Sequence, residues 1–383
     1  MLRESDRTRT GHPGFLWERS DWPSLTWVEE RLSEPLMRAS HAHERLCKGL
    51  DGIDAEARNE VHLQTLTQDL VKSTEIRETA YDPEKVRSSV ARRLGMEIGG
   101  LVPSDRNEDA VVDMMLDATD NYAQPLTVQR LFSWHTALFP TGRSGMRKII
   151  VGNWRNDSNG PMGVRSGPIG KETVHFEAPP AERVPDELQK FLNWFENPVD
   201  TDPVLVAGLA HLWFLTIHPF DDGNGRIARA IADMTLARAE QSSQRFYSMS
   251  AQIRKERNAY DKIIELSQKG ELDVSSWLEW FLNCQVRAID TAQQTLDATL
   301  EKARFWQRFK EVTLNPRQIK MLNRLLDGFN GKLTSTKWAK IAKCQQDTAC
   351  HDITDLIARG ALQKAPSGGR KTSYSLVIDT QDR

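Results

Sequence analysis

The spacing of apolar residues predicts a mainly helical chain with a helix–loop–helix near its centre. Residues 204–217 are apolar almost throughout, and the run is rich in Ala and Leu and free of Pro, which is typical of a buried helix. Pro219 disfavours helical backbone at His218, so this helix is expected to end there. Helical spacing resumes after Gly225, at Ile227, Ala230, Ile231 and Met234. The pattern therefore predicts two helices joined by a loop at 218–225.

The same spacing predicts the elements on either side of this pair. Helices are expected at residues 27–50, 60–74, 108–140, 185–197 and 240–300. Residues 148–151 are strand-like, and residues 162–176 combine β-forming and turn residues in the pattern of a β-hairpin.

From about residue 314 the pattern changes to three short helices, at 316–328, 334–343 and 348–359, followed by a hairpin. This order resembles a winged helix, and Asp347 is expected to cap its third helix. We therefore expect an N-terminal helical domain at 1–100, a helical core with the hairpin at 101–300, and a winged helix at 310–383.

The loop and the start of the second central helix suit a phosphate. The first N–H groups of a helix lack internal partners, and the helix dipole favours anions there. Gly223, Asn224 and Gly225 allow close approach of the backbone. Arg226 and Arg229 are three residues apart, so both can reach one polyphosphate from the same helix face.

Two further residues of this stretch carry groups that phosphate chemistry uses. Asp222 is a hard oxygen ligand, suited to a magnesium ion shared with phosphate oxygens. His218 is suited to act as a general base. Residues 218–229 match the Fic family signature, His-x-Phe-x-(Asp/Glu)-Gly-Asn-Gly-Arg-x-x-Arg, at every specified position. The chain therefore resembles Fic proteins of the adenylyltransferase type.

The resemblance implies transfer of AMP from ATP to a Tyr, Thr or Ser hydroxyl of a target protein, with self-modification. His218 would take the hydroxyl proton, and Asp222 would bind Mg²⁺ or Mn²⁺. The Gly-Asn-Gly backbone would cradle phosphate oxygens, and the two arginines would neutralise the β- and γ-phosphates. Because the Gly-Asn-Gly sequence is intact, transfer of phosphate from inverted ATP is disfavoured. Tyr260 falls where the family has groups near the adenine, and core packing is its alternative role.

The resemblance also implies an inhibitory segment at the end of the helix predicted at 60–74. The family pattern is Ser/Thr-x-x-x-Glu, whose glutamate pairs with the second motif arginine. Counted from Ser73, the glutamate position holds Arg77; counted from Thr74, it holds Glu78. The family-like sequence after residue 82 favours the count from Ser73. We therefore expect weak inhibition or none.

The predicted hairpin at 162–176 resembles the Fic flap, which holds a target chain by strand addition. Its expected docking residues are Val164, Ser166, Gly167, Pro168, Ile169 and Gly170. A plain surface hairpin is the alternative. His135, His175 and His211 form no metal-ligand pattern, and each is expected to be structural.

Composition and charge indicate the class of protein, its cellular compartment and its possible partners. The formal net charge is −2, which does not suggest a protein that coats polyanions, and no apolar run is long enough to span a membrane. The polar N-terminus is unlike a signal peptide, and four scattered cysteines favour the cytoplasm. Beyond residue 301 basic residues outnumber acidic ones by about two to one. The third helix of the winged helix carries two acidic residues, Asp352 and Asp355, and only one basic residue, Arg359. We therefore expect DNA and another protein equally as its binding partner. A homodimer is left open.

Two other functions are compatible with the sequence. One is the reverse reaction, hydrolysis of a nucleotidylated protein, for which the inhibitory glutamate would position water. Its uncertain placement disfavours this function. The other is a DNA-binding regulator whose core only senses nucleotide, which the complete catalytic set disfavours.

Overall fold

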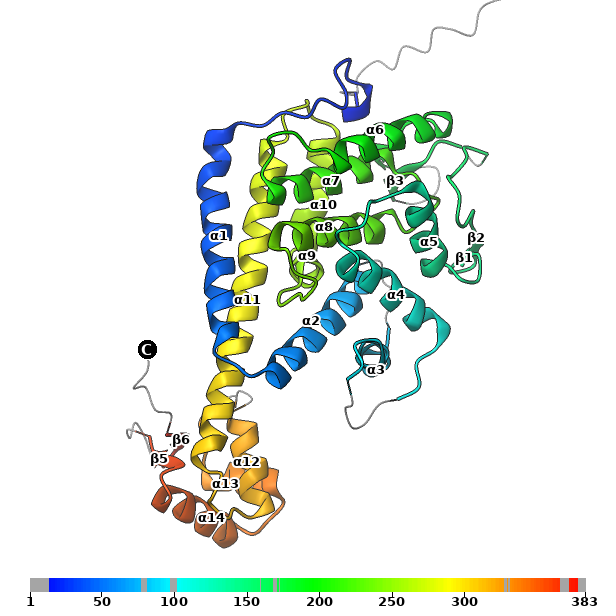
Figure 1. Ribbon diagram of the computed structural model, residues 1–383. Helices are drawn as coiled ribbons and strands as arrows, with labels where there is room; N and C mark the ends of the chain where they lie inside the picture. The colour runs from blue at the N-terminus through cyan, green and yellow to red at the C-terminus, as the bar shows by residue number, and fades with distance from the viewer. Residues whose placement is uncertain are drawn as a thin grey trace, which may run out of the picture. The chain divides into compact units, whose positions relative to one another are not determined.

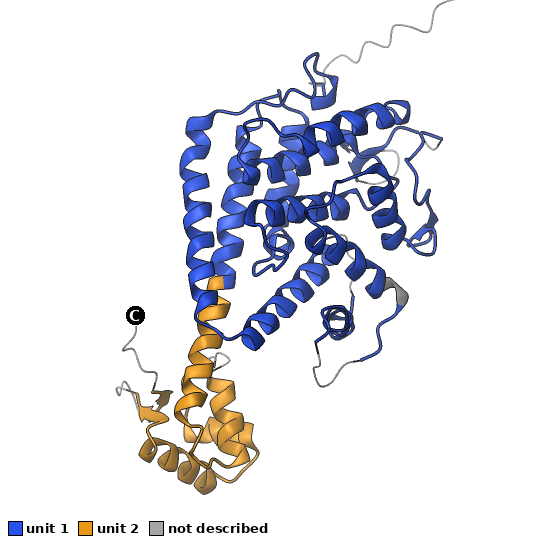
Figure 2. Ribbon diagram, viewed as in Figure 1, with its two compact units in different colours: residues 1–292 blue, residues 293–383 orange. Residues whose placement is uncertain are grey.

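The computed structural model describes residues 14–76, 81–96, 102–158, 160–167, 171, 173–326, 329, 331–365 and 372–377, without the side chains of 106 and 107. The chain forms two compact units, residues 1–292 (unit 1) and 293–383 (unit 2), coloured separately in Figure 2. Unit 1 contains both the expected N-terminal helices and the expected helical core. None of the helices in these ranges is long and apolar enough to cross a membrane.

The fold is mainly helical, as the sequence predicts. The helices that begin in unit 1 are α1 (Glu29–Asp51), α2 (Ala55–Glu75), α3 (Pro83–Arg93), α4 (Arg106–Asp120), α5 (Val128–Leu138), α6 (Val184–Glu196), α7 (Pro203–Ile217), α8 (Asn224–Glu240), α9 (Met249–Lys255), α10 (Arg257–Gln268) and α11 (Ser275–Arg308), with short 3-10 turns η1 (Leu16–Glu18) and η2 (Ala181–Arg183). The helix expected at 108–140 is two helices, because the chain turns at residues 121–127 between α4 and α5.

The pair α7 and α8 forms the centre of unit 1 (Figure 1). Every residue of α7 from Leu205 to Ile217 is buried, and α8 is buried from Asn224 to Ala237. A helix that is apolar on all sides is stable only inside a protein, which explains why α7 lies among the other helices. Residues 218–223 connect the two, so the loop is shorter than the predicted 218–225 because α8 begins at Asn224.

Helices α1 and α11 run side by side in the same direction (Figure 1). Arg31 donates to Glu279 at 2.8 Å, and Arg45 donates to Asp290 at 2.5 Å. Arg38, midway between them, donates to Asn283. These exposed contacts add little stability. Burial of the apolar face of α1, at Leu32, Ala39, Ala42, Leu46 and Leu50, contributes more.

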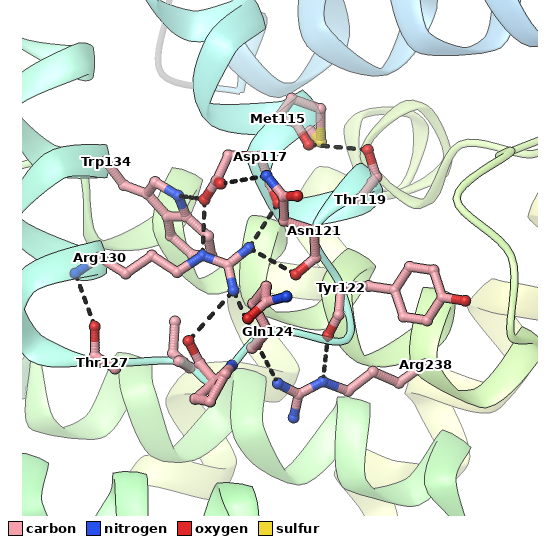
Figure 3. Close-up of polar contacts among 12 residues, drawn as sticks. Met115, Asp117, Thr119, Asn121, Tyr122, Gln124, Thr127, Arg130, Trp134 and Arg238 are labelled. Carbon is pink, nitrogen blue, oxygen red and sulfur yellow. Dashed lines mark hydrogen bonds and ion pairs between the residues drawn. The ribbon is translucent and has the colours of Figure 1, made fainter.

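A polar network fixes α5 against α4 (Figure 3). The Asp117 carboxylate accepts hydrogen bonds from Arg130 Nε at 2.7 Å and Trp134 Nε1 at 2.6 Å. Burial opposes the charge of Asp117, but these bonds and one from Asn121 lower its pKa below the usual range. Arg238 of α8 donates to the carbonyl of Tyr122 at 2.7 Å. The network thus orients α5 relative to α4 and α8.

Short antiparallel hairpins complete unit 1. Strands β1 (Arg143–Ser144) and β2 (Arg147–Lys148) form one, so the strand expected at 148–151 is not present at 149–151. Strands β3 (Gly163–Ser166) and β4 (Thr173–Glu177) form the other, with Val164 opposite Phe176. The predicted hairpin at 162–176 is confirmed, and we call β3–β4 the flap.

Unit 2 holds the last three helices and a hairpin. These are α12 (Pro316–Leu326), α13 (Ser335–Ala342), α14 (Gln346–Ala358), β5 (Leu362–Lys364) and β6 (Tyr374–Leu376). Trp338, Ile353 and Leu356 lie in its apolar core. The prediction that Asp347 caps the third helix is wrong, because α14 begins at Gln346 and Gln345 is the capping residue.

Candidate functional site

His218 ends α7 in the left-handed conformation, with φ 50° and ψ 57°. Its backbone N–H donates to Phe214 O at 3.0 Å, which closes the last helical turn. The residue is 9% exposed, and Nδ1 of its ring lies 3.2 Å from Leu215 O. A carbonyl only accepts, so Nδ1 carries the proton in the neutral ring and the lone pair is on Nε2. His218 is therefore held in the tautomer in which Nε2 is the basic atom.

Arg155 fixes the backbone immediately after the His218 side chain. Its Nε donates to His218 O at 2.8 Å, and its backbone N–H donates to Pro219 O at 3.0 Å. The side chain is buried, which lowers its pKa, while Asp157 at 2.9 Å opposes that shift. The sequence analysis missed Arg155 because a lone arginine 63 residues before His218 carries no motif signal.

The loop after His218 is shaped by Asn224 and Gly223. The buried Asn224 side chain accepts from Phe220 N at 3.0 Å and donates to Phe220 O at 2.8 Å. Gly223 precedes α8 at φ 84°, and a Cβ there would lie 2.9 Å from Phe139 of the α5 end. Glycine is required at 223 for its backbone angle and for this close approach. Asn224 and Gly223 thus fix the conformation of the loop that leads into α8.

Asp222 is oriented by three neighbours. Its side chain accepts from Gly223 N at 2.6 Å and from the Ser144 hydroxyl, while its carbonyl lies 3.1 Å from His135 Nε2. His135 Nδ1 accepts from Gly152 N at 3.3 Å, so Nε2 is the donor. Burial lowers the pKa of His135 to about 4, which keeps the ring neutral.

A single half-buried carboxylate with a hydroxyl beside it fits the way Mg²⁺ is usually held, by few protein oxygens plus water and substrate phosphate. Across the described part of the chain, no group of three or more His, Cys, Asp or Glu side chains could hold a metal ion by itself. Asp222 is the carboxylate that would do so in company with a bound phosphate.

The two motif arginines occupy different surroundings. The Arg226 guanidinium lies 4.8 Å from the ring centroid of Phe139. Arg229 is 3% exposed, and it donates from Nε to Ser73 Oγ at 3.0 Å and from Nη2 to Ser73 O at 2.9 Å. The end of α2 therefore contacts the second motif arginine through Ser73.

Of the residues assigned to that segment, two are described. The Thr74 hydroxyl donates within its own helix, to Val71 O at 2.8 Å. Ser73, by contrast, faces Arg229. Arg77 and Glu78 lie outside the described residues.

The flap lies next to His218. Phe176 of β4 is buried, and its ring centroid is 6.4 Å from that of His218. Val164 is 44% exposed, Ser166 is exposed, and Gly167 has φ 101°. Pro168, Ile169 and Gly170, which the sequence predicts as docking residues, lie outside the described residues.

Tyr260 is part of an aromatic core. Its side chain is 6% exposed and its hydroxyl lies 2.8 Å from His211 Nε2, with Trp277 and Trp280 packed alongside. This position fits the packing alternative for Tyr260. His211 lies here, His135 beside Asp222, and His175 on the flap, so the three histidines form no cluster.

Two family models match the chain. Residues 15–96 match a domain of unknown function, DUF4172, and residues 125–236 match the Fic/DOC family. The second range contains His135, Arg155 and the complete signature. Residues 125–236 are a Fic domain.

Relatives of the Fic domain are named for nucleotide transfer. A probable protein adenylyltransferase of Aquifex aeolicus is 28% identical over 167 residues, 42% of this chain and 51% of the relative. A protein adenylyltransferase Fic of Nematostella vectensis is 30% identical over 123 residues, 30% of this chain and 26% of the relative. A uridine 5'-monophosphate transferase of Xanthomonas campestris is 28% identical over 127 residues, 30% of this chain and 21% of the relative. The chain thus spans at most about half of these relatives.

The fold agrees with solved Fic structures. A Fic family protein from Desulfovibrio desulfuricans superposes with a TM-score of 0.52 at 18% identity, covering 93% of this chain and 98% of that one. A Fic-domain signalling protein from Bacteroides thetaiotaomicron gives 0.51 at 18% identity, covering 68% and 97%. These likenesses establish the fold of the Fic domain.

Proposed function

We propose that the Fic domain transfers AMP from ATP to a Tyr, Thr or Ser hydroxyl of a protein, including its own chain. The observation that carries this proposal is the tautomer of His218, whose lone pair is on Nε2 at the end of α7, next to the start of α8. The target hydroxyl oxygen attacks the α-phosphorus, His218 Nε2 takes the hydroxyl proton, and the bond to the β-phosphate breaks to release pyrophosphate. General base catalysis of this kind contributes about 100- to 10,000-fold.

The charge of the triphosphate would be balanced by α8. The backbone of Gly223, Asn224 and Gly225 cradles phosphate oxygens at the positive end of the helix dipole. Arg226 and Arg229 neutralise the β- and γ-phosphates and the departing pyrophosphate. Arg229 would exchange Ser73 for phosphate when ATP binds.

Asp222 would hold Mg²⁺ or Mn²⁺, with Ser144 fixing the rotamer of its carboxylate. When bound, the metal supplies positive charge to the phosphate oxygens. His135 orients the backbone of the same residue by donating to its carbonyl.

The choice of nucleotide can be tested directly, because the relatives include both adenylyl- and uridylyltransferases by name. Purified protein is incubated separately with α-labelled ATP and α-labelled UTP, and labelled products are identified by mass spectrometry. We expect label from ATP and a mass increase of one AMP. Label from UTP in preference to ATP would overturn the assignment of the nucleotide.

The cytoplasm is the proposed cellular compartment of the protein, since the four cysteines are free.

The two competing functions make different predictions in the same assay. A hydrolase would remove AMP from a modified protein faster than it adds AMP. A nucleotide sensor would bind ATP without transferring any part of it. Faster removal of AMP than addition would identify a hydrolase, and ATP binding without transfer would identify a nucleotide sensor. Either result would contradict the proposed transfer.

For unit 2 we propose a winged helix that binds duplex DNA through α14. The two aspartates of α14 that disfavoured DNA point to other partners within unit 2. Asp352 is 5% exposed and accepts from Arg317 at 2.9 Å, and Asp355 pairs with Arg359 at 2.8 Å. The bond from Arg317 and others lower the pKa of Asp352 although burial opposes it.

The exposed residues of α14 include uncharged hydrogen-bonding groups. Gln346, His351 and Thr354 are exposed, and Lys340 and Lys343 are exposed around the preceding helix end. Such groups suit base edges and phosphates, respectively.

The DNA proposal is tested by gel shifts of the full chain on random duplex at several salt concentrations. Lys340→Glu together with Lys343→Glu should weaken binding and reduce the salt slope by about two, one per phosphate contact. Lys148→Glu in unit 1 is the matched control. If the double variant binds as well as the control, α14 and its neighbourhood do not form the DNA surface.

A further inference from the structure

A chain of side-chain contacts links the flap to α10, outside the nucleotide site. Ser166 Oγ lies 2.6 Å from His175 Nε2, and His175 Nδ1 lies 2.9 Å from Glu265 Oε2. The other carboxylate oxygen of Glu265 accepts from Lys269 Nζ at 2.6 Å. Ser166 belongs to β3, His175 to β4 and Glu265 to α10, and Lys269 is the C-cap residue of α10. The chain therefore ties both flap strands to one helix.

The contact with Glu265 determines which nitrogen of the His175 ring carries the donated proton. A carboxylate only accepts, so His175 Nδ1 is the donor to Glu265. Burial opposes the charge of Glu265, yet the hydrogen bonds from Lys269 and His175 lower its pKa below the usual range. Glu265 is thus a charged acceptor with two donors, the kind of hydrogen bond that holds geometry best.

The contacts of β4 leave β3 as the open edge of the flap. Ala178 N donates to Met162 O at 2.9 Å, so the neighbouring Glu177 carbonyl points away from β3. That carbonyl accepts from Trp17 Nε1 at 2.7 Å, and Lys269 Nζ lies 3.5 Å from Val174 O. Among the described residues the flap sheet has only these two strands. A further strand would therefore add to β3.

We propose that His175, Glu265 and Lys269 are positioning residues that hold the flap against α10, so that an extended segment of the target protein adds to the edge of β3. This rests on the proposed function. Phe176 lies beside the His218 ring, so a flap held in this way sets where the target hydroxyl lies relative to the base. Loss of the anchor should weaken use of the target and leave use of ATP unchanged.

The first arm of the test measures the flap itself. Hydrogen exchange is followed in wild type, Glu265→Ala, His175→Ala, and the matched control Asp261→Asn, which alters an acidic residue of α10 whose partner is Arg257. We expect protection of residues 163–166 and 173–177 to fall about tenfold in the first two variants only. Exchange in α7 and α8 should match wild type. Flap protection in Glu265→Ala equal to that in Asp261→Asn would overturn the proposal.

The second arm measures kinetics on a pool of extended synthetic peptides containing Tyr and Thr. In Glu265→Ala the KM for peptide should rise about tenfold, and the KM for ATP should stay within about twofold. Glu265→Gln, which still accepts from His175 but loses the ion pair with Lys269, should give an intermediate KM. A KM for ATP that rises as much as the KM for peptide would contradict a positioning role. If wild type modifies no peptide and no protein, the proposed function fails, and the exchange arm still decides whether the anchor exists.

Discussion

Arg229, the second arginine of the Fic signature, donates hydrogen bonds to both the side chain and the backbone carbonyl of Ser73 at the end of α2. The same guanidinium is the group that would bind the end of the triphosphate. Ser73 and ATP therefore compete for Arg229. Since a neutral hydroxyl is a weaker partner than a phosphate, the competition should be modest.

Replacing Ser73 should increase activity slightly. Ser73→Ala removes the hydroxyl and leaves the carbonyl, so about 1 kcal/mol is lost from the competing contact, which corresponds to a roughly fivefold gain. The expected result is a few-fold lower KM for ATP in self-modification with α-labelled ATP. Thr74→Ala is the control, because the Thr74 hydroxyl donates within its own helix. A larger gain for Thr74→Ala than for Ser73→Ala would show that the segment is anchored on Thr74.

Removing the carboxylate of Asp222 should remove the dependence on metal. Asp222→Asn should lower the rate and flatten its response to Mg²⁺, because an amide oxygen is a poorer ligand than a carboxylate. Ser144→Ala, which frees the carboxylate to rotate, should raise the Mg²⁺ concentration needed for half-maximal rate without abolishing transfer. The measurement is a metal titration of the initial rate. Equal rates in excess chelator and in Mg²⁺ for wild type would exclude Asp222 as a ligand.

Gly223 should tolerate no side chain. Gly223→Ala combines a positive φ with a contact of 2.9 Å to the Phe139 ring, so either that ring or the start of α8 must shift. Gly145→Ala is the control, since it also has positive φ but meets nothing within 4 Å. We expect the control to lose about 1 kcal/mol of stability and keep ATP binding, and Gly223→Ala to lose ATP binding. Unimpaired binding in Gly223→Ala would exclude this turn from the phosphate site.

The neutral His135 makes stability depend on pH. Its folded pKa is about 4 because of burial, against an ordinary 6.5, so between these values the unfolded chain binds more protons. The free energy of unfolding must fall as pH falls through that window, by about 2 kcal/mol between pH 7 and pH 5. His135→Gln cannot titrate and can still donate to Asp222 O. Denaturant unfolding at both pH values should show a smaller loss for the variant than for wild type; equal losses would contradict the assignment.

The sequence predicted the parts of the site that are local and left out the parts that are not. The signature lies within one loop and the beginning of α8, so its spacing alone placed His218, Asp222 and the arginines together. Arg155, Ser144 and His135 reach the same loop from distant segments, and no short-range pattern records such contacts. A charge count likewise cannot tell which face of α14 an aspartate occupies, and in the structure Asp352 is buried against Arg317.

Helix boundaries show the same limit. Apolar periodicity continues through residues 108–140, but the turn that separates α4 from α5 is stabilised by Arg130 and Arg238 holding carbonyls of residues 122 and 124. The bonds from Arg238 depend on α8, whose position is a property of the whole fold.

The central claim is that His218 drives transfer of the α-phosphoryl group of ATP. It is tested by incubating wild type and His218→Ala with ATP labelled at either the α- or the γ-phosphorus, with binding of ATP and circular dichroism as controls for the fold. The account predicts protein-bound label from the α-position only, reduced by about 100- to 10,000-fold in His218→Ala with ATP binding retained. Label from the γ-position, or transfer by His218→Ala within a few-fold of wild type, would contradict it.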